Sequence, residues 1–207
     1  KGESLYNTAL ALQAMSADII VIRHPHSGAP HFLANQLTAS ILNAGDGTHA
    51  HPTQALIDLH TINSNLGRIE ELKVVIVGDI LYSRVARSNL WGLTTMGAKV
   101  VLCAPPTLIP PDFLSGEHHR ENHPFSSITI EPCLEKALDN ADVVMTLRLQ
   151  SERQLAGHLP SLREYSQTYG INPTNLKFAK PNALVMHPGP MNEGIEIAPE
   201  VAHGTQS

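Results

Sequence analysis

Short apolar runs alternate with amphipathic stretches along this chain, and most of the stretches end at glycine or proline. The runs at residues 19–22, 73–77, 99–103 and 141–147 are rich in Val, Ile and Leu. Strands that are buried on both faces have this composition, and runs of this length are too short for helices. We therefore predict buried strands there. Shorter strands are expected at 41–43, 128–130 and 183–186.

Between these runs, apolar residues recur every three or four positions, which predicts amphipathic helices. Ser4 is expected to cap a helix that runs to about Ala17, and Pro52 suits the first turn of another. The apolar side of the first helix would consist of Leu5, Ala9, Leu12 and Met15, and that of the second of Ala55, Leu56, Leu59 and Ile62. Further helices are expected at 30–39, 83–96 and 133–138.

Strands and helices that alternate at this spacing indicate a parallel α/β fold. The segment Asn65-Leu66-Gly67 is the expected boundary between two domains, 1–66 and 67–207. Ligands of such folds bind beyond the carboxyl ends of the strands, so polar residues that follow apolar runs are the candidates for a site. The turn at Gly78-Asp79 lacks the glycine fingerprint of nucleotide-binding folds, which predicts a Rossmann-like shape without that cofactor.

Composition narrows the classes of function. The 207 residues are 42% hydrophobic and 4% aromatic, which predicts a mostly aliphatic core. A net charge of −5 argues against general nucleic-acid binding, and the apolar runs are too short to span a membrane. Cys103 and Cys133 have no metal-type spacing. With no signal-like start after Lys1, these features favour a reduced, cytoplasmic location.

Residues 45–54, Gly-Asp-Gly-Thr-His-Ala-His-Pro-Thr-Gln, are the most informative stretch. The glycines permit a tight turn, and the helix that starts at Pro52 offers free N–H groups to an anion or a polarised oxygen. His51 and Gln54 lie across that start and are able to face one small ligand. Two other interpretations stay open: His51 or Thr53 as a helix cap, and a metal pair of His49 and His51. A histidine cluster at His118, His119 and His123 is expected on the solvated surface.

Three arginines directly follow predicted strands or begin predicted helices, namely Arg23, Arg84 and Arg148. A guanidinium beside an amide such as Gln150 suits a carboxylate, although an ion pair to Glu152 would also explain Arg148. The turn His187-Pro188-Gly189-Pro190 would present fixed backbone carbonyls to a ligand amine. No serine nucleophile elbow or carboxylate pair occurs at these positions. The arginine, histidine and glutamine side chains fit a polyanionic substrate on which charge grows at a carbonyl oxygen.

Six segments, in this order and across nearly all of the chain, resemble the catalytic chain of the aspartate carbamoyltransferase family. They are Lys1-Gly2-Glu3-Ser4, Ile22-Arg23-His24-Pro25, His51-Pro52-Thr53-Gln54-Ala55-Leu56, Gly78-Asp79 with Arg84, Arg148-Leu149-Gln150 with Arg153, and His187-Pro188-Gly189-Pro190. The resemblance implies two Rossmann-like parallel-sheet domains and a transferase of pyrimidine biosynthesis. Its substrates would be carbamoyl phosphate and L-aspartate, its product N-carbamoyl-L-aspartate, and it would need no metal or organic cofactor.

The resemblance also implies roles for single residues. Arg23 and His51 would be catalytic and would contact the carbonyl oxygen of carbamoyl phosphate, with Arg23 also on its phosphate. Gln54 would hold the carbamoyl amine together with the backbone carbonyls of Gly189 and Pro190. The aspartate-binding set would be Lys1, Arg84, Arg148 and Gln150, with Arg153 supporting the loop of Gln150. Because Lys1 matches a lysine that reaches a neighbouring subunit, the resemblance implies a homotrimer with shared sites. A dihydroorotase or regulatory chain is a further partner that the resemblance allows.

This chain departs from the family at three places. It has no Ser-Thr-Arg-Thr phosphate loop, and it stops before the last helix of the family. We therefore expect a missing N-terminal segment and C-terminal end, an incomplete first domain and an incomplete phosphate site. Glu193 stands where many members carry arginine. Two alternatives remain: an inactive or truncated chain that acts as a scaffold, and an ornithine carbamoyltransferase. The second is disfavoured because ornithine carbamoyltransferases usually carry a Cys in this turn, where the chain has Gly189. In addition, the two arginines Arg84 and Arg148 suit a dicarboxylate better than a diamino acid.

Overall fold

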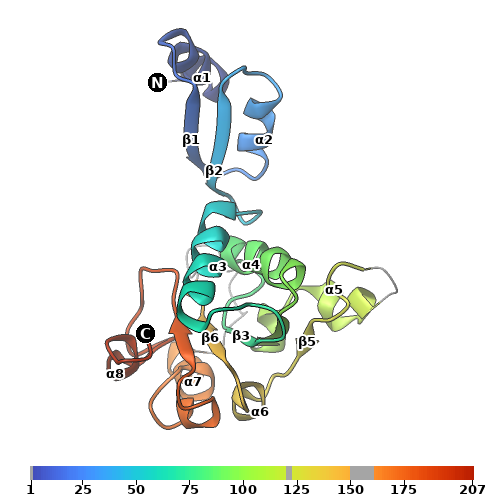
Figure 1. Ribbon diagram of the computed structural model, residues 1–207. Helices are drawn as coiled ribbons and strands as arrows, with labels where there is room; N and C mark the ends of the chain where they lie inside the picture. Colours follow the sequence, from blue (N-terminus) through green and yellow to red (C-terminus); the bar gives the residue numbers. More distant parts are fainter. Residues whose placement is uncertain (1, 120–122, 150–160) are drawn as a thin grey trace.

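The computed structural model describes residues 2–119, 123–149 and 161–207. Figure 1 shows a smaller part that holds the first two strands, and a larger part that holds the remaining strands; helix α3 begins near the junction and lies beside α4 on the larger part. The elements up to α3 are α1 (Leu5–Ala14), β1 (Ile19–His24), α2 (Ala29–Ala34), β2 (Ser40–Asp46) and α3 (Pro52–Leu66). Strands β1 and β2 pair in parallel as a two-stranded sheet.

The larger part is built on a five-stranded sheet of order β5-β4-β3-β6-β7, in which every neighbouring pair is parallel. The strands are β3 (Lys73–Val77), β4 (Lys99–Cys103), β5 (Thr129–Ile130), β6 (Val143–Thr146) and β7 (Leu184–Met186). The α-helices are α4 (Arg84–Thr95), α5 (Pro111–Leu114), α6 (Leu134–Leu138), α7 (Leu162–Tyr169) and α8 (Pro199–Ala202). Single 3-10 turns occur at Pro106–Leu108, Glu117–His119 and Leu176–Phe178. The parallel α/β fold expected from the sequence is confirmed.

The strand order fixes where a ligand can lie. From β3 the chain first moves outward to β4 and β5, and then returns to the opposite side of β3 to add β6 and β7. The connections that follow β3 and β6 therefore diverge, and a crevice opens beyond the carboxyl ends of these two strands. Arg84 follows β3 and Arg148 follows β6, so each arginine lies at one side of this switch point.

Aliphatic side chains form the core around the central strands. Residues 74–77 of β3 are at most 1% exposed, as are Val143 and Val144 of β6. Helices α3 and α4 pack against each other over this sheet (Figure 1). The predicted strands of this sheet agree with the observed ones to within two residues, because continuous apolar runs are specific to strands covered on both faces.

The first part corrects several expectations. Strand 19–22 is not buried throughout: Ile20 is 9% exposed, but Ile19 and Val21 are 60% and 64% exposed. A sheet covered on one face alternates in this way. Helix α1 does begin after its Ser4 cap, but it ends at Ala14, and of its expected apolar side only Ala9 is buried. Helix α2 is also shorter than predicted and spans Ala29–Ala34.

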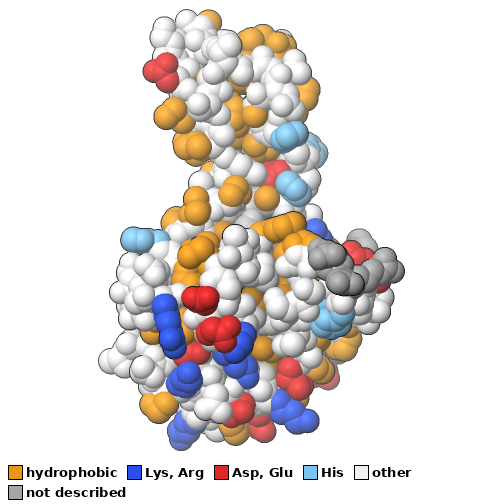
Figure 2. Space-filling view, turned by 45° about the vertical axis from the view of Figure 1, so that its right-hand side comes forward, with side chains coloured by type: hydrophobic (Ala, Val, Ile, Leu, Met, Phe, Trp, Pro, Cys, Tyr) orange, Lys and Arg blue, Asp and Glu red, His pale blue; other side chains and the backbone are white. Residues whose placement is uncertain are grey.

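Charged side chains are unevenly distributed over the surface. In the view of Figure 2 the smaller part shows almost no Lys, Arg, Asp or Glu, whereas these side chains gather on the larger part. Hydrophobic side chains are exposed on the smaller part, among them Phe32 and Leu42 at 50% and 45% exposure. Within the described ranges, no helix is both long and apolar enough to cross a membrane.

Candidate active site

A polar cavity of about 150 Å³ lies where the two parts meet. Its lining includes Arg23 from β1, Arg148 after β6, and residues from the start of α3, the start of α4 and the turn after β7. The full set is Arg23, His51, Gln54, Ser83, Arg84, Val85, Arg148, Pro188, Gly189 and Pro190. Eight of these were singled out in the sequence. Ser83 and Val85 are additions, and both adjoin Arg84 along the chain. Lys1, Gln150 and Arg153 lie outside the described residues.

The loop between β2 and α3 is organised by the carboxylate of Asp46, which is 1% exposed. It accepts hydrogen bonds from Gly28 N at 2.6 Å, Asn43 Nδ2 at 2.9 Å and Ala50 N at 3.1 Å. His49 Nδ1 lies 3.0 Å from Asp46 Oδ2. Burial alone would raise the pKa of Asp46, but these hydrogen bonds and the nearby His49 outweigh burial and lower it. The Asp46 carboxylate therefore fixes the loop that leads to His51.

Arg84 is buried at 6% exposure, so its guanidinium is not a surface cation. Its Nη1 donates to the carbonyl oxygen of Gly47 at 3.3 Å. Gly45 has φ +116°, and a Cβ built at that position would lie 2.7 Å from Arg84 Cζ. The absence of a side chain at Gly45 thus makes room for the guanidinium. The glycines of residues 45–47 serve a close packing contact as well as a turn.

His51 both caps α3 and faces the cavity, so the two interpretations of this residue are compatible. Its backbone N–H donates to Ser88 Oγ at 2.8 Å, and its Nδ1 accepts from Gln54 N at 3.3 Å. The pKa of His51 is lowered, first by burial and then by the charges of Arg84 and Arg23. A neutral imidazole that accepts at Nδ1 carries its proton on Nε2. His51 is therefore prepared to donate a hydrogen bond from Nε2 without carrying a charge.

The imidazole of His187 holds the turn after β7 through contacts at both of its ring nitrogens. Gly189 N donates to His187 Nδ1 at 2.9 Å, and His187 Nε2 lies 3.3 Å from Glu196 Oε1. Glu196 is 1% exposed and also accepts from Asn192 N at 2.7 Å. These hydrogen bonds hold the turn that the sequence predicts after β7. The bond between Gly189 and Pro190 is cis. Glu193 lies 3.2 Å from His203 Nε2.

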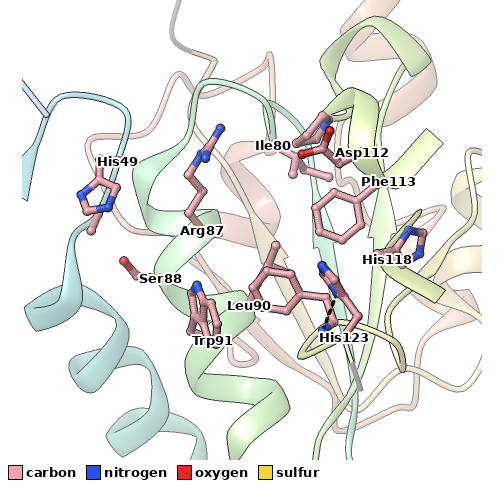
Figure 3. A pocket seen from close by; sticks show the side chains of 13 residues that line it. His49, Ile80, Arg87, Ser88, Leu90, Trp91, Asp112, Phe113, His118 and His123 are labelled. Carbon is pink, nitrogen blue, oxygen red and sulfur yellow. Dashed lines mark hydrogen bonds between the residues drawn. The ribbon is translucent and has the colours of Figure 1, made fainter. Parts of the chain in front are cut away.

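A second cavity, of about 360 Å³, lies beside α4 and is lined by a different set of residues. Figure 3 shows Arg87, Ser88 and Trp91 of α4 on one side, and Asp112, Phe113 and His118 on the other. His118 is 2% exposed, with its ring centroid 4.9 Å from that of Phe113. The expectation that His118 belongs to the solvated surface is wrong, because its ring packs into an aromatic cluster.

The metal interpretation of His49 and His51 gains no support from the geometry. His49 is engaged with Asp46, and His51 with the start of α3. Across residues 2–119, 123–149 and 161–207, no group of three or more His, Cys, Asp or Glu side chains is arranged to hold a metal ion. The cavity instead offers guanidinium groups, one imidazole and one amide, which is a donor set for anions and for a carbonyl oxygen.

Comparison with protein families shows to which family this chain belongs. The model of the Asp/Orn binding domain of aspartate/ornithine carbamoyltransferases matches residues 70–207, and that of the carbamoyl-P binding domain matches residues 1–64. The chain belongs to the aspartate/ornithine carbamoyltransferase family. The first match ends within α3, which spans Pro52–Leu66, and the second begins at residue 70.

Carbamoyltransferases with similar sequences come from several bacteria. The chain is 58% identical over all of its 207 residues to the aspartate carbamoyltransferase catalytic subunit of Roseiflexus sp. (strain RS-1), and spans 63% of that relative. It is also 58% identical over 202 residues to the catalytic subunit of Chloroflexus aurantiacus (strain J-10-fl), covering 98% of this chain and 64% of the relative. The chain thus spans somewhat under two thirds of the length of these relatives.

Solved carbamoyltransferase structures share the fold over the whole chain. Aspartate transcarbamoylase from Trypanosoma cruzi, in complex with N-(phosphonacetyl)-L-aspartic acid, superposes with a TM-score of 0.84 at 31% identity, covering 100% of this chain and 64% of that one. Ornithine carbamoyltransferase from Pyrococcus furiosus reaches 0.82 at 29% identity, with the same coverage. The overall fold therefore does not distinguish aspartate from ornithine carbamoyltransferases, and the distinction depends on the side chains in the cavity.

Proposed function

We propose that this protein transfers the carbamoyl group of carbamoyl phosphate to the amino group of L-aspartate, releasing N-carbamoyl-L-aspartate and phosphate. The observation that carries the proposal is the convergence of Arg23, His51, Gln54, Arg84 and Arg148 on one cavity. Related structures support it, since the Trypanosoma cruzi enzyme has been solved with carbamoyl phosphate and aspartate and with carbamoyl aspartate and phosphate.

The chemistry follows from the donors. The amine nitrogen of aspartate attacks the carbamoyl carbon, and negative charge builds on the carbonyl oxygen. Arg23 and the Nε2–H of His51 stabilise that oxygen. The bond from the carbamoyl carbon to the phosphate oxygen then breaks, phosphate leaves with the electron pair, and the proton of the amine goes to the phosphate. Holding two anions in line against their repulsion supplies much of the rate.

The remaining groups bind and orient the substrates. Gln54 and the backbone carbonyls of Gly189 and Pro190 hold the carbamoyl amine, and Arg84 and Arg148 hold the carboxylates of aspartate. Lys1 and Gln150 complete the aspartate site, with Arg153 supporting the loop of Gln150. Residues 1–66 serve mainly carbamoyl phosphate, and residues 67–207 mainly aspartate. No metal or organic cofactor is part of this proposal.

The proposal extends to assembly and location. The protein acts in the cytoplasm, in pyrimidine biosynthesis, as a homotrimer whose active sites are shared between subunits through Lys1. A dihydroorotase or a regulatory chain is a further partner. The similarity of the whole chain to catalytic subunits supports this part of the proposal. The size of the particle, measured by light scattering, tests the trimer.

Arg148 provides the test that separates aspartate from ornithine. The full-length natural protein is assayed for carbamoyl product with carbamoyl phosphate and either L-aspartate or L-ornithine. We expect product with aspartate, and we expect Arg148→Ala to raise the KM for aspartate about 10- to 100-fold, the range for a hydrogen bond to a charged group. Product with ornithine alone would establish the other substrate class. No product with either would favour an inactive scaffold, and an unchanged aspartate KM in the variant would refute the role of Arg148.

A further inference from the structure

A buried carboxylate that takes no part in the proposed mechanism lies directly behind the cavity. Asp58 is on α3 and is 5% exposed, yet it does not line the cavity. A buried acidic side chain is costly unless hydrogen bonds compensate it. Burial raises the pKa of Asp58, and hydrogen bonds from Asn89 and Gln54 counteract part of that effect. A position in the packed interface of α3 and α4 would ordinarily favour an apolar residue, so the carboxylate calls for an explanation.

Both oxygens of Asp58 accept hydrogen bonds from side-chain amides. Gln54 Nε2 donates to Oδ1 at 2.9 Å, and Asn89 Nδ2 donates to Oδ2 at 2.7 Å. Gln54 and Asp58 are four residues apart on α3 and therefore share one face of the helix. Asn89 reaches Asp58 from α4 and is 0% exposed. The chain of contacts runs from the interior of the helix pair to the lining of the cavity.

These contacts determine which end of the Gln54 amide faces the cavity. A glutamine amide has a donor end and an acceptor end, whereas an ionised carboxylate only accepts. Because Nε2 is bound to Asp58, the free end is the acceptor Oε1. The amine of a carbamoyl group is a donor, so it requires an acceptor. In the opposite orientation, Gln54 Oε1 would face the Asp58 carboxylate, which is also an acceptor, and the N–H groups of Nε2 would face those of the carbamoyl amine.

We propose that Asp58, held in place by Asn89, is a positioning residue that orients the Gln54 amide so that Oε1 receives the carbamoyl amine. The proposal rests on the proposed function, because only that function supplies a carbamoyl group. Asn89 is itself oriented by the same carboxylate: among the described residues, its Oδ1 has no hydrogen-bond partner, and its Nδ2 is directed to Asp58.

The test compares two ligands that differ in the amine. Carbamoyl phosphate carries the group that Gln54 would accept, and inorganic phosphate does not. In the full-length natural protein, Asp58→Ala should raise the KM for carbamoyl phosphate about 2- to 10-fold, the range of one neutral hydrogen bond. The inhibition constant of inorganic phosphate should stay unchanged. Thr61→Ala is the matched control, because it removes an α3 hydrogen bond, Thr61 Oγ1 to Ile57 O at 2.8 Å, away from the cavity. It should change neither constant.

A double-mutant cycle then asks whether Asp58 acts through Gln54. Gln54→Ala combined with Asp58→Ala should be no worse than Gln54→Ala alone. Effects that multiply, or an inhibition constant for phosphate that rises in parallel, would assign Asp58 a general structural role and overturn the proposal. If wild-type protein yields no carbamoyl product, the proposed function fails first, and this inference fails with it.

Exchanging the two side chains provides a rescue that conserves volume. Asp58→Asn leaves an amide that is able to face Gln54 with either end, so it should raise the KM for carbamoyl phosphate. Adding Asn89→Asp places an acceptor-only group beyond it. Asn at position 58 must then donate to position 89 and present its oxygen to Gln54. The double exchange should restore the wild-type KM. Failure to restore it in a protein that unfolds at the wild-type temperature would overturn the orientation argument.

Discussion

Gly45 makes a prediction whose size follows from two features of the structure. Its φ of +116° is a conformation that residues with side chains rarely adopt, and a Cβ at this position would lie 2.7 Å from Arg84 Cζ and 2.8 Å from Arg84 Nε. Gly45→Ala should therefore carry a backbone penalty of about 1–3 kcal/mol and also displace a guanidinium in the cavity. For a chain of this size, each 1 kcal/mol lowers the melting temperature by about 2–4 °C.

The chain offers a matched control for the backbone penalty alone. Gly67 has φ +73°, and no atom lies within 4 Å of a Cβ built there. Gly67→Ala should lower the melting temperature but leave the KM for aspartate unchanged. Gly45→Ala should lower the melting temperature and also reduce kcat/KM for aspartate by about 10- to 100-fold, the range for loss of a hydrogen bond to a charged group.

Thermal unfolding and steady-state kinetics on both variants separate the two effects. If Gly45→Ala destabilises the protein as Gly67→Ala does and retains the wild-type kcat/KM, then Arg84 either shifts without consequence or does not bind aspartate. The argument that the glycine exists to make room for this arginine would then be wrong.

Two further predictions concern groups outside the cavity. Asp46→Asn should lower the free energy of unfolding at pH 7 by about 2–4 kcal/mol, since the buried carboxylate holds several loop donors. Because the pKa of Asp46 is lowered from 3.8, the stabilisation by its carboxylate is complete above pH 3.8 and is lost as the pH falls through the lower pKa of the folded state. Urea unfolding at pH 7 and at a pH well below 3.8 should show this loss in the wild type and not in the variant. A thiol reagent should modify exposed Cys133 in the native protein, whereas buried Cys103, whose pKa is raised to about 12, should react only after unfolding. Intact mass before and after denaturation counts the modified thiols, and two modifications in the native state would contradict the burial.

The sequence predicted the central sheet well because its strands are covered on both faces. Runs such as 73–77 and 99–103 are apolar at almost every position, so their limits can be read directly and agree with β3 and β4. Helix α7 could not be found in this way. Its segment, Leu162–Tyr169, is mostly polar and buries Tyr165 and Tyr169, which are four residues apart. A helix that contributes two buried side chains leaves little periodicity to detect.

Most residues that line the cavity could be predicted from the order of strands and helices. The contacts behind the cavity could not, because they depend on how two helices pack. Residues after the strands converge in a parallel sheet whatever the details of packing, which is why Arg84 and Arg148 line one cavity. Asp58 and Asn89 were missed because an acidic residue inside a helix is usually exposed, and their contact exists only once α3 packs on α4. The spacing of four between Gln54 and Asp58 was the available signal, but the spacing alone does not establish burial.

The cavity concentrates charge that the composition conceals. The chain has a net charge of −5, yet Arg23, Arg84 and Arg148 face a volume of about 150 Å³. Burial lowers the pKa of His51, and the positive charges of Arg84 and Arg23 lower it further. In the proposed function, both substrates are anions, and their attraction to these guanidinium groups would contribute to binding. Because its pKa is lowered, His51 favours the neutral form, and in the proposed reaction its Nε2–H would stabilise the growing negative charge without losing a proton.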